Sequence, residues 1–138
     1  MSAKDIIHDT VKNALIKDGW TITDDPYVIE FEEVTLYADL GAERPIAAER
    51  GTEKIVVEVK SFVSRSLMQD LKEAIGQYVI YLSYLEESEP DRKLFLAVGE
   101  KVYDEFFQLK AVQFIMERNA VSLIVIDLSH EEIVRWTN

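Results

Sequence analysis

The sequence of 138 residues contains no cysteine and only two histidines, His8 and His130. Disulfide bonds and thiolate metal sites are therefore excluded, and a histidine-rich metal site is not expected from two widely separated imidazoles. Any bound metal would be held mainly by carboxylate oxygens, which are the ligands of hard divalent cations. Internal repeats and low-complexity tracts are also missing from the chain.

Long apolar runs are absent too, and the N-terminus lacks the apolar core of a signal peptide. These absences predict a cytoplasmic protein without a membrane-spanning segment. The length and the hydrophobic content of 48% predict one domain, spanning residues 1–138, with a substantial buried core.

Positive charge is scarce, because 15 Lys and Arg face 26 Asp and Glu, which gives a formal net charge of −11. A protein that binds DNA unaided usually presents a basic surface that displaces the counterions of the phosphates. The acidity is uneven, since the segment from Arg44 to Lys72 sums to +2 and the remainder to −13. DNA therefore remains a candidate partner near this segment, with the help of other proteins.

Hydrophobic periodicity and turn residues predict an α/β fold, a mixed central sheet flanked by helices. The predicted helices are residues 3–17, 66–84 and 100–118. The predicted strands are residues 20–23, 34–40, 46–50, 55–60, 93–98 and 122–127, with a short final strand or turn at 131–136. Asp24, Asp25 and Pro26 are typical of a turn, although tandem aspartates can also bind a cation, and Gly51 to Glu53 are typical of a hairpin connection.

The strand at residues 55–60 carries the most suggestive chemistry. Alternation would point Ile55, Val57 and Val59 into the core, and Val56, Glu58 and Lys60 to the other face. A carboxylate and an ammonium would then lie side by side. Together with a second carboxylate they would form the minimum set for metal-assisted hydrolysis of a phosphodiester.

Three acids precede this strand and could supply the second carboxylate: Asp39, Glu43 and Glu49. Asp39, nineteen positions before Glu58, is the preferred metal ligand, although each acid could equally be an ordinary surface residue. Gln77, on the helix that follows the strand, could point at the same site or satisfy a backbone group. His8, on the first helix, could belong to the site or be a structural histidine.

The pattern Asp39 … Glu58-Val59-Lys60, placed between a strand meander and a helix, resembles the PD-(D/E)XK, or restriction-endonuclease-like, superfamily. The resemblance implies an αβββαβ core, Asp39 and Glu58 as ligands of Mg²⁺ (or Mn²⁺), and Lys60 activating or positioning water. Members similar to Holliday-junction resolvases carry a glutamate eleven residues before the glycine that ends the first helix, a slot that His8 occupies here. The family's Pro-Asp pair is not present as such, since Ile46 follows Pro45.

A more specific resemblance covers essentially the whole chain. The segments at residues 14–20, 39–44, 55–62 and 74–78 are similar to the XisH family of cyanobacteria, factors that control excision of the fdxN element. This resemblance implies a role in a programmed DNA rearrangement that a site-specific recombinase carries out, and an XisI-like companion.

Two functions follow from these resemblances. The chain could be a magnesium-dependent endonuclease in which Lys60, Glu58, Gln77 and His8 form the catalytic group. It could instead be a non-catalytic accessory protein that binds a recombinase or an XisI-like partner. Because cutting a duplex needs two sites, the nuclease function also leads us to expect a homodimer.

Overall fold

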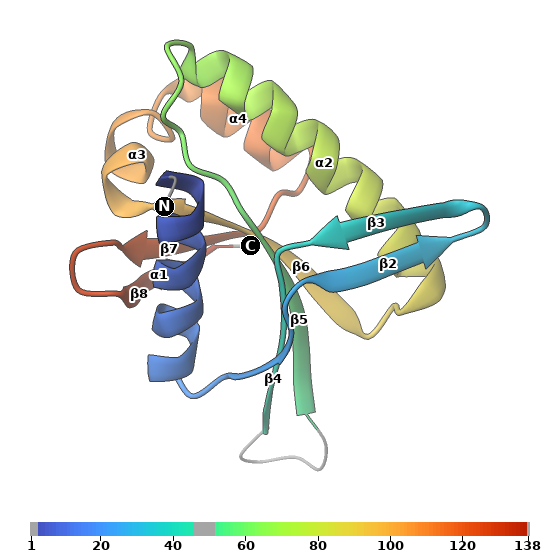
Figure 1. The fold of residues 1–138 in the computed structure, drawn as a ribbon. Helices are drawn as coiled ribbons and strands as arrows, with labels where there is room; N and C mark the ends of the chain where they lie inside the picture. The colour runs from blue at the N-terminus through green and yellow to red at the C-terminus, as the bar shows by residue number, and fades with distance from the viewer. Residues whose placement is uncertain (1–2, 46–51, 138) are drawn as a thin grey trace.

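The computed structural model describes residues 3–45 and 52–137. Its elements, in chain order, are α1 (Ala3–Lys17), β1 (Thr21–Asp24), β2 (Tyr27–Phe31), β3 (Val34–Ala38), β4 (Leu40–Pro45), β5 (Thr52–Val59), α2 (Leu67–Ser88), β6 (Arg92–Gly99), α3 (Glu100–Glu105), α4 (Lys110–Arg118), β7 (Leu123–Asp127) and β8 (Glu132–Trp136) (Figure 1). The predicted mixed α/β fold is confirmed.

Six strands form the main sheet in the order β1-β4-β5-β6-β7-β8. The pairs β5–β6 and β6–β7 are parallel, and the other pairs are antiparallel. The central strands are therefore covered by helices on both faces, as parallel strands usually are. Apart from β2 and β3, the elements from α1 to β6 follow the expected order αβββαβ.

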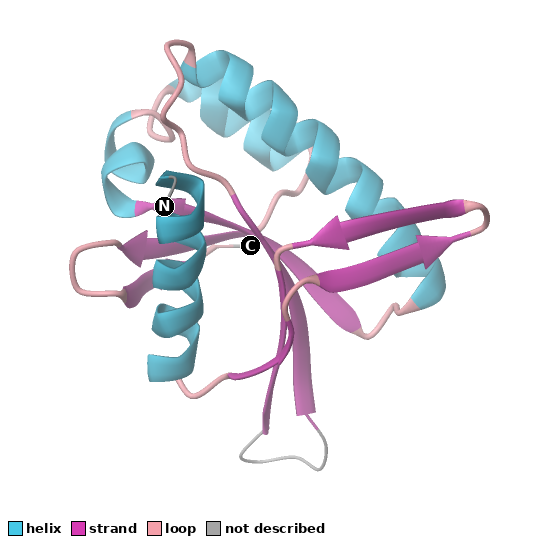
Figure 2. Ribbon diagram, viewed as in Figure 1, coloured by secondary structure: helices cyan, strands magenta, loops and turns pink. Residues whose placement is uncertain are grey.

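Helices lie on both sides of the main sheet (Figure 2). On one face, Val11, Ala14 and Leu15 of α1 pack on Ile55 and Val57 of β5 and their neighbours. On the opposite face, α2, the α3–α4 region and the β2–β3 hairpin share a second core with the central strands. Ile55, Val57 and Val59 point into a core as predicted, and this core is the one that α1 covers. The opposite face of β5 is not open along its length, because Val56 is fully buried in the second core.

The hairpin of β2 and β3 forms a separate two-stranded sheet beside α2 (Figure 1). The sequence analysis did not predict β2, and its single strand at residues 34–40 is wrong. β3 ends at Ala38, Asp39 lies at a bend, and Leu40 begins β4 in the other sheet. The chain changes sheets here because Ala38 packs in the α2 core, whereas Leu40 packs in the α1 core.

The single helix predicted for residues 100–118 is also wrong, since α3 ends at Glu105 and α4 begins at Lys110. Phe106 and Phe107 lie in the break, and both are buried. Both rings contact Phe62, with ring centroids 6.0 and 5.3 Å away. Consecutive side chains of a helix point about 100° apart, which explains why the helix breaks at these two residues. In a continuous helix, only one of the two rings could point directly at that partner.

The predictions also missed β4, because residues 41–45 lie between the predicted strands 34–40 and 46–50, and Thr52 and Glu53 begin β5 instead of forming a hairpin connection. The remaining predictions agree with the structure apart from their ends. Helix α1 has the predicted bounds, and α2 extends four residues past the predicted end to Ser88. The predicted strand at 46–50, the hairpin residue Gly51 and the candidate ligand Glu49 lie outside the described residues. Across residues 3–45 and 52–137, no helix is long and apolar enough to span a membrane.

Candidate functional site

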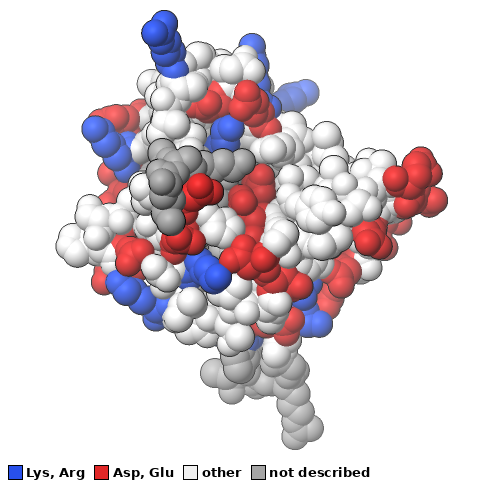
Figure 3. All heavy atoms as spheres, viewed as in Figure 1, with Lys and Arg blue, Asp and Glu red and all other residues white. Residues whose placement is uncertain are grey.

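A cavity of about 390 Å³ lies where α1, the β3–β4 bend, the end of β5 and α2 meet. All five residues of the predicted site line it: His8, Asp39, Glu58, Lys60 and Gln77. The remaining lining residues are Asp5, Ile7, Tyr37, Val59, Ser61 and Tyr81. Figure 3 shows Asp and Glu side chains gathered across the middle of this side of the molecule.

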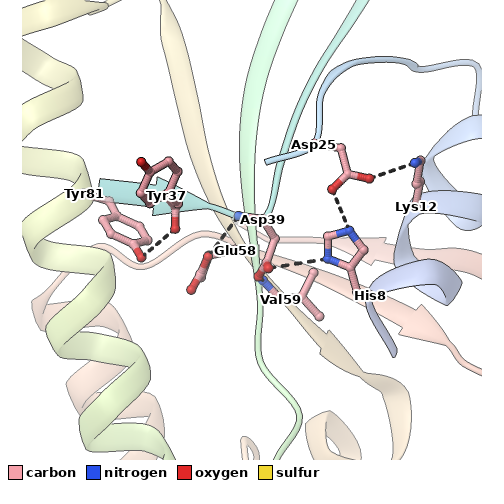
Figure 4. Close-up of polar contacts among 8 residues, drawn as sticks. All are labelled: His8, Lys12, Asp25, Tyr37, Asp39, Glu58, Val59 and Tyr81. Atoms are coloured by element: carbon pink, nitrogen blue, oxygen red, sulfur yellow. Dashed lines mark hydrogen bonds and ion pairs between the residues drawn. The ribbon is translucent and has the colours of Figure 1, made fainter. Parts of the chain in front are cut away.

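Strand pairing brings Asp39 and Glu58 together. Leu40 pairs with Val57 in the antiparallel register, so Asp39 lies opposite Glu58. The amide of Asp39 donates to Oε1 of Glu58 (3.2 Å), and the amide of Val59 donates to Oδ2 of Asp39 (2.8 Å). These bonds hold both carboxylates where β5 ends and β4 begins, with Glu58 only 8% exposed (Figure 4).

Lys60 follows directly on β5, and its amide donates to the carbonyl oxygen of Ala97. Its Nζ donates to Oε2 of Glu73 on α2 at 2.9 Å. This hydrogen bond and the positive charge of Lys60 lower the pKa of the Glu73 carboxyl below its ordinary value. The sequence analysis missed Glu73, although its position one turn before Gln77 on α2 is a signal that could have found it.

His8 enters the cavity from α1 and lies between two carboxylates (Figure 4). Its Nε2 is 2.9 Å from Oδ1 of Asp25, and its Nδ1 is 3.4 Å from Oδ1 of Asp39. Asp25 also accepts a hydrogen bond from Nζ of Lys12 at 2.8 Å. The sequence analysis favoured a turn over cation binding for Asp25 and did not predict its contact with His8, which depends on the path of the chain after β1.

Tyr81 closes one side of the cavity from α2. Its hydroxyl donates to the carbonyl oxygen of Tyr37 at 3.1 Å. Burial, together with the nearby carboxylates of Glu58 and Asp39, raises the pKa of Tyr81 to about 12. The phenol therefore stays protonated at neutral pH and acts as a hydrogen-bond donor. Tyr78 instead is structural, because its buried hydroxyl donates to the carbonyl oxygen of Leu94 and accepts from the amide of Ser122.

Of the alternative ligands, the structure turns Glu43 away from the cavity. Its Oε2 is 3.3 Å from a guanidinium nitrogen of Arg92, whose side chain is 9% exposed. Glu43 pairs across the sheet with Lys54, four residues before Glu58. Of the three candidate acids Asp39, Glu43 and Glu49, Asp39 is thus the one that contacts Glu58 within the described residues.

The donor set suits a hydrated hard cation. Within residues 3–45 and 52–137, no three His, Asp or Glu side chains are already gathered as a metal cluster. Mg²⁺ typically takes one or two carboxylates and keeps several waters, so Asp39 and Glu58 fit its needs.

The family model described as "XisH protein" matches residues 1–134 of the chain. The chain belongs to the XisH family. An XisH family protein from Nostoc punctiforme PCC 73102 has a similar crystal structure, with a TM-score of 0.89 and 40% sequence identity over 97% of this chain and 100% of that one. A second similar structure is a fdxN element excision controlling factor protein from Anabaena variabilis, with a TM-score of 0.88 and 42% identity over 97% and 99% of the two chains. None of the curated proteins matches the sequence.

Proposed function

We propose that this XisH protein takes part in the excision of a DNA element by metal-dependent hydrolysis of phosphodiester bonds. The observation that carries the proposal is the meeting of Asp39 and Glu58, with Lys60 in the same cavity. The name of the Anabaena variabilis protein, a factor controlling excision of the fdxN element, supports the biological context. The αβββαβ order and the Asp39 … Glu58-Val59-Lys60 pattern support placement in the PD-(D/E)XK superfamily.

In this function Asp39 and Glu58 would hold Mg²⁺ or Mn²⁺ through their carboxylates. When bound, the cation would polarise the phosphate and lower the pKa of a coordinated water. Lys60 would exchange Glu73 for that water or for a phosphate oxygen, and so orient the attack. Gln77 would hydrogen-bond the DNA backbone, and His8 would fix the position of Asp39.

A second candidate function is that of a non-catalytic accessory protein that binds an XisI-like partner or a recombinase. The observation that favours it is the formal net charge of −11, with acidic groups around the cavity (Figure 3). Such a surface repels DNA and attracts basic proteins. A basic partner, or a second copy of the chain, would also be compatible with cleavage.

Cleavage assays separate the two functions. Supercoiled, branched and single-stranded DNA would be incubated with Mg²⁺ or Mn²⁺ and with the protein, alone and with an XisI-like partner. We expect strand cleavage that falls at least about 100-fold in Glu58→Gln and Lys60→Ala, because each removes a group from the reacting centre.

Glu30→Gln is the matched control, since it removes one exposed negative charge on β2 outside this cavity. It should cleave like the unaltered protein. Failure to cut any substrate under these conditions, or equal cutting by Glu58→Gln, would overturn the nuclease function and leave the accessory one.

A further inference from the structure

The β2–β3 hairpin is a two-stranded sheet, so each of its strands has an outer edge. One face of the hairpin packs on α2 through Tyr27, Ile29 and Ala38. Within residues 3–45 and 52–137, β2 pairs with β3 alone. An unpaired strand edge presents backbone N–H and C=O groups that an extended segment of another chain can pair with.

The two edges of the hairpin differ. At the β3 edge, the carbonyl oxygen of Tyr37 accepts a hydrogen bond from the hydroxyl of Tyr81 at 3.1 Å, so this carbonyl points away from β2. In an antiparallel pair, opposite residues point their backbone groups either toward each other or outward, and the two kinds of pair alternate. Val28 lies opposite Tyr37, so Val28 and, two residues on, Glu30 point their backbone groups outward at the β2 edge.

A cavity of about 410 Å³ borders the β2 edge. The consecutive residues 27–30 all line it, and because strand side chains alternate between faces, the edge of β2 must run along it. The end of α2 and the start of β6 form the opposite side. The lining residues there are Leu85, Ser88, Glu89 and Arg92, with Asp24 at the end of β1.

The walls of this cavity carry negative charge. Residues 18–43 contain eight Asp or Glu and residues 73–91 contain five, and neither segment contains Lys or Arg. Arg92 also lines the cavity, but its side chain is 9% exposed and lies 3.3 Å from carboxylate oxygens of both Glu43 and Glu89. Asp24 and Glu30 therefore leave the lining acidic. Figure 3 shows further Asp and Glu side chains on the projecting end of the hairpin.

The C-terminal end of α2 also favours a basic occupant. A helix C-terminus carries a partial negative charge and is stabilised by cations. The last turn of α2 has no basic residue, and Glu86, Glu87 and Glu89 lie at this end instead. This arrangement costs folding stability, and a Lys or Arg side chain bound in the cavity would relieve the repulsion.

We propose that the β2 edge binds an extended basic segment of a partner protein, which adds a third strand to the β2–β3 sheet. Backbone hydrogen bonds to Val28 and Glu30 set the register of the segment, and its Lys or Arg side chains face the acidic walls. The same acids repel a second copy of the chain and nucleic acid at this edge. The inference goes beyond the proposed function and depends on neither a metal nor cleavage.

The first test uses a fluorescein-labelled peptide of about eight residues in which lysine and valine alternate. Fluorescence anisotropy with chelator present measures its affinity for the full chain. The control peptide has proline at its two central valines, which keeps the charge but prevents strand pairing. We expect the control to bind at least about tenfold more weakly, because it cannot form the backbone hydrogen bonds.

The bound edge is identified by amide hydrogen exchange, followed by NMR with the unlabelled alternating peptide. We expect exchange of the amides of Val28 and Glu30 to slow when the peptide binds, because these N–H groups become hydrogen-bonded. The amides of Thr35 and Tyr37 at the β3 edge should not change.

Val28→Pro removes an outward N–H that the β2–β3 pairing does not use, and an edge strand tolerates proline at such a position. Thr35→Pro is the matched control, since Thr35 lies opposite Glu30 and points its N–H outward at the β3 edge. We expect binding of the alternating peptide to fall at least about tenfold in Val28→Pro and to stay unchanged in Thr35→Pro. Circular dichroism checks that both variants fold.

A charge reversal gives a second variant that keeps every backbone group. Glu30→Lys should weaken binding of the alternating peptide about tenfold through repulsion. Asp104→Lys is its control, because it makes the same charge change at an exposed position of α3 outside this cavity. It should bind the peptide nearly as well as the unaltered protein.

Three results would overturn the inference. The first is no binding of the alternating peptide at millimolar concentration. The second is equal binding of the proline peptide, or unchanged exchange at Val28 and Glu30, which would show only diffuse attraction between opposite charges. The third is slow exchange of these two amides without peptide that depends on protein concentration, which would assign the edge to a second copy of the chain.

Discussion

Single side chains at this site depend on partners from distant parts of the chain. The face of β5 on which Glu58 lies could be predicted from its neighbours in the strand. Alternation alone also predicts that Lys60 lies on the same face. Asp39 could be proposed from its spacing, but its contact with Glu58 depends on the β4–β5 register. The contact of Asp25 with His8 could not be predicted, because it joins elements whose relative placement no local pattern encodes. Glu73 lies one turn before Gln77 on α2, so its side of the helix could have been predicted, but its contact with Lys60 could not.

The second histidine allows a prediction at the same scale. Nδ1 of His130 lies 2.9 Å from Oδ2 of Asp127 in the β7–β8 turn. The hydrogen bond to Asp127 and the carboxylate charge raise the pKa of His130 above its ordinary value. We expect Asp127→Asn to lower this pKa, which an NMR titration of the ring would measure.

The same pair makes stability depend on pH. The pKa of His130 is raised in the folded protein. Its contribution to the free energy of unfolding is therefore full below about pH 6.5 and is lost as pH rises through the raised pKa. The pKa of Asp127 is lowered, first by its hydrogen bond to His130, so its contribution is lost as pH falls through that lowered value. Urea unfolding measures the difference in the free energy of unfolding between the unaltered protein and Asp127→Asn. This difference should be largest between the lowered pKa of Asp127 and the raised pKa of His130, and it should shrink at lower and at higher pH. A difference that keeps growing at alkaline pH would contradict the assignment.

At the scale of elements, most helices and strands could be predicted because periodicity and turn residues are local. The errors occur where tertiary packing overrides the local pattern. The alternation of residues 34–40 hides a change of sheet at Asp39, and the helical pattern of residues 100–118 hides the break in which Phe106 and Phe107 are both buried.

Helix α2 offers a paired prediction with opposite signs. The hydroxyl of Ser66 caps its N-terminus by accepting from the amide of Gln69 at 3.1 Å, so Ser66→Ala should lower the free energy of unfolding by about 1 kcal/mol. A Cβ at Gly76 would meet no atom within 4 Å, so Gly76→Ala should raise it by up to about 1 kcal/mol through helix propensity.

Urea unfolding of both variants and of the double variant measures these effects. The two sites lie ten residues apart on the helix, and their contributions should add within about 0.5 kcal/mol. A destabilising Gly76→Ala would show that the open space beside Gly76 is occupied in solution.

At the scale of the whole molecule, the negative charge decides how DNA can approach. A chain of formal charge −11 gains little from counterion release. We expect the isolated protein to bind duplex DNA no more tightly than the roughly 10⁻⁴ to 10⁻⁶ M of non-specific complexes, with a shallow dependence on salt.

Fluorescence anisotropy with labelled duplex DNA over a range of salt concentrations checks this expectation, with chelator in place of divalent metal as the control. A basic partner should increase both the affinity and the salt dependence. Tight binding by the isolated chain with a steep salt slope would instead reveal a phosphate-binding surface on the chain itself.

The β2–β3 hairpin begins just after Asp25 and ends just before Asp39, the two carboxylates that His8 contacts. The imidazole of His8 therefore connects the two ends of this projecting hairpin, whose turn carries Glu32 and Glu33 (Figure 1). The same hairpin packs on α2 through Tyr27, Ile29 and Ala38. A partner that binds its far end and moves it would therefore act on the α2 packing and on the two carboxylates that His8 contacts.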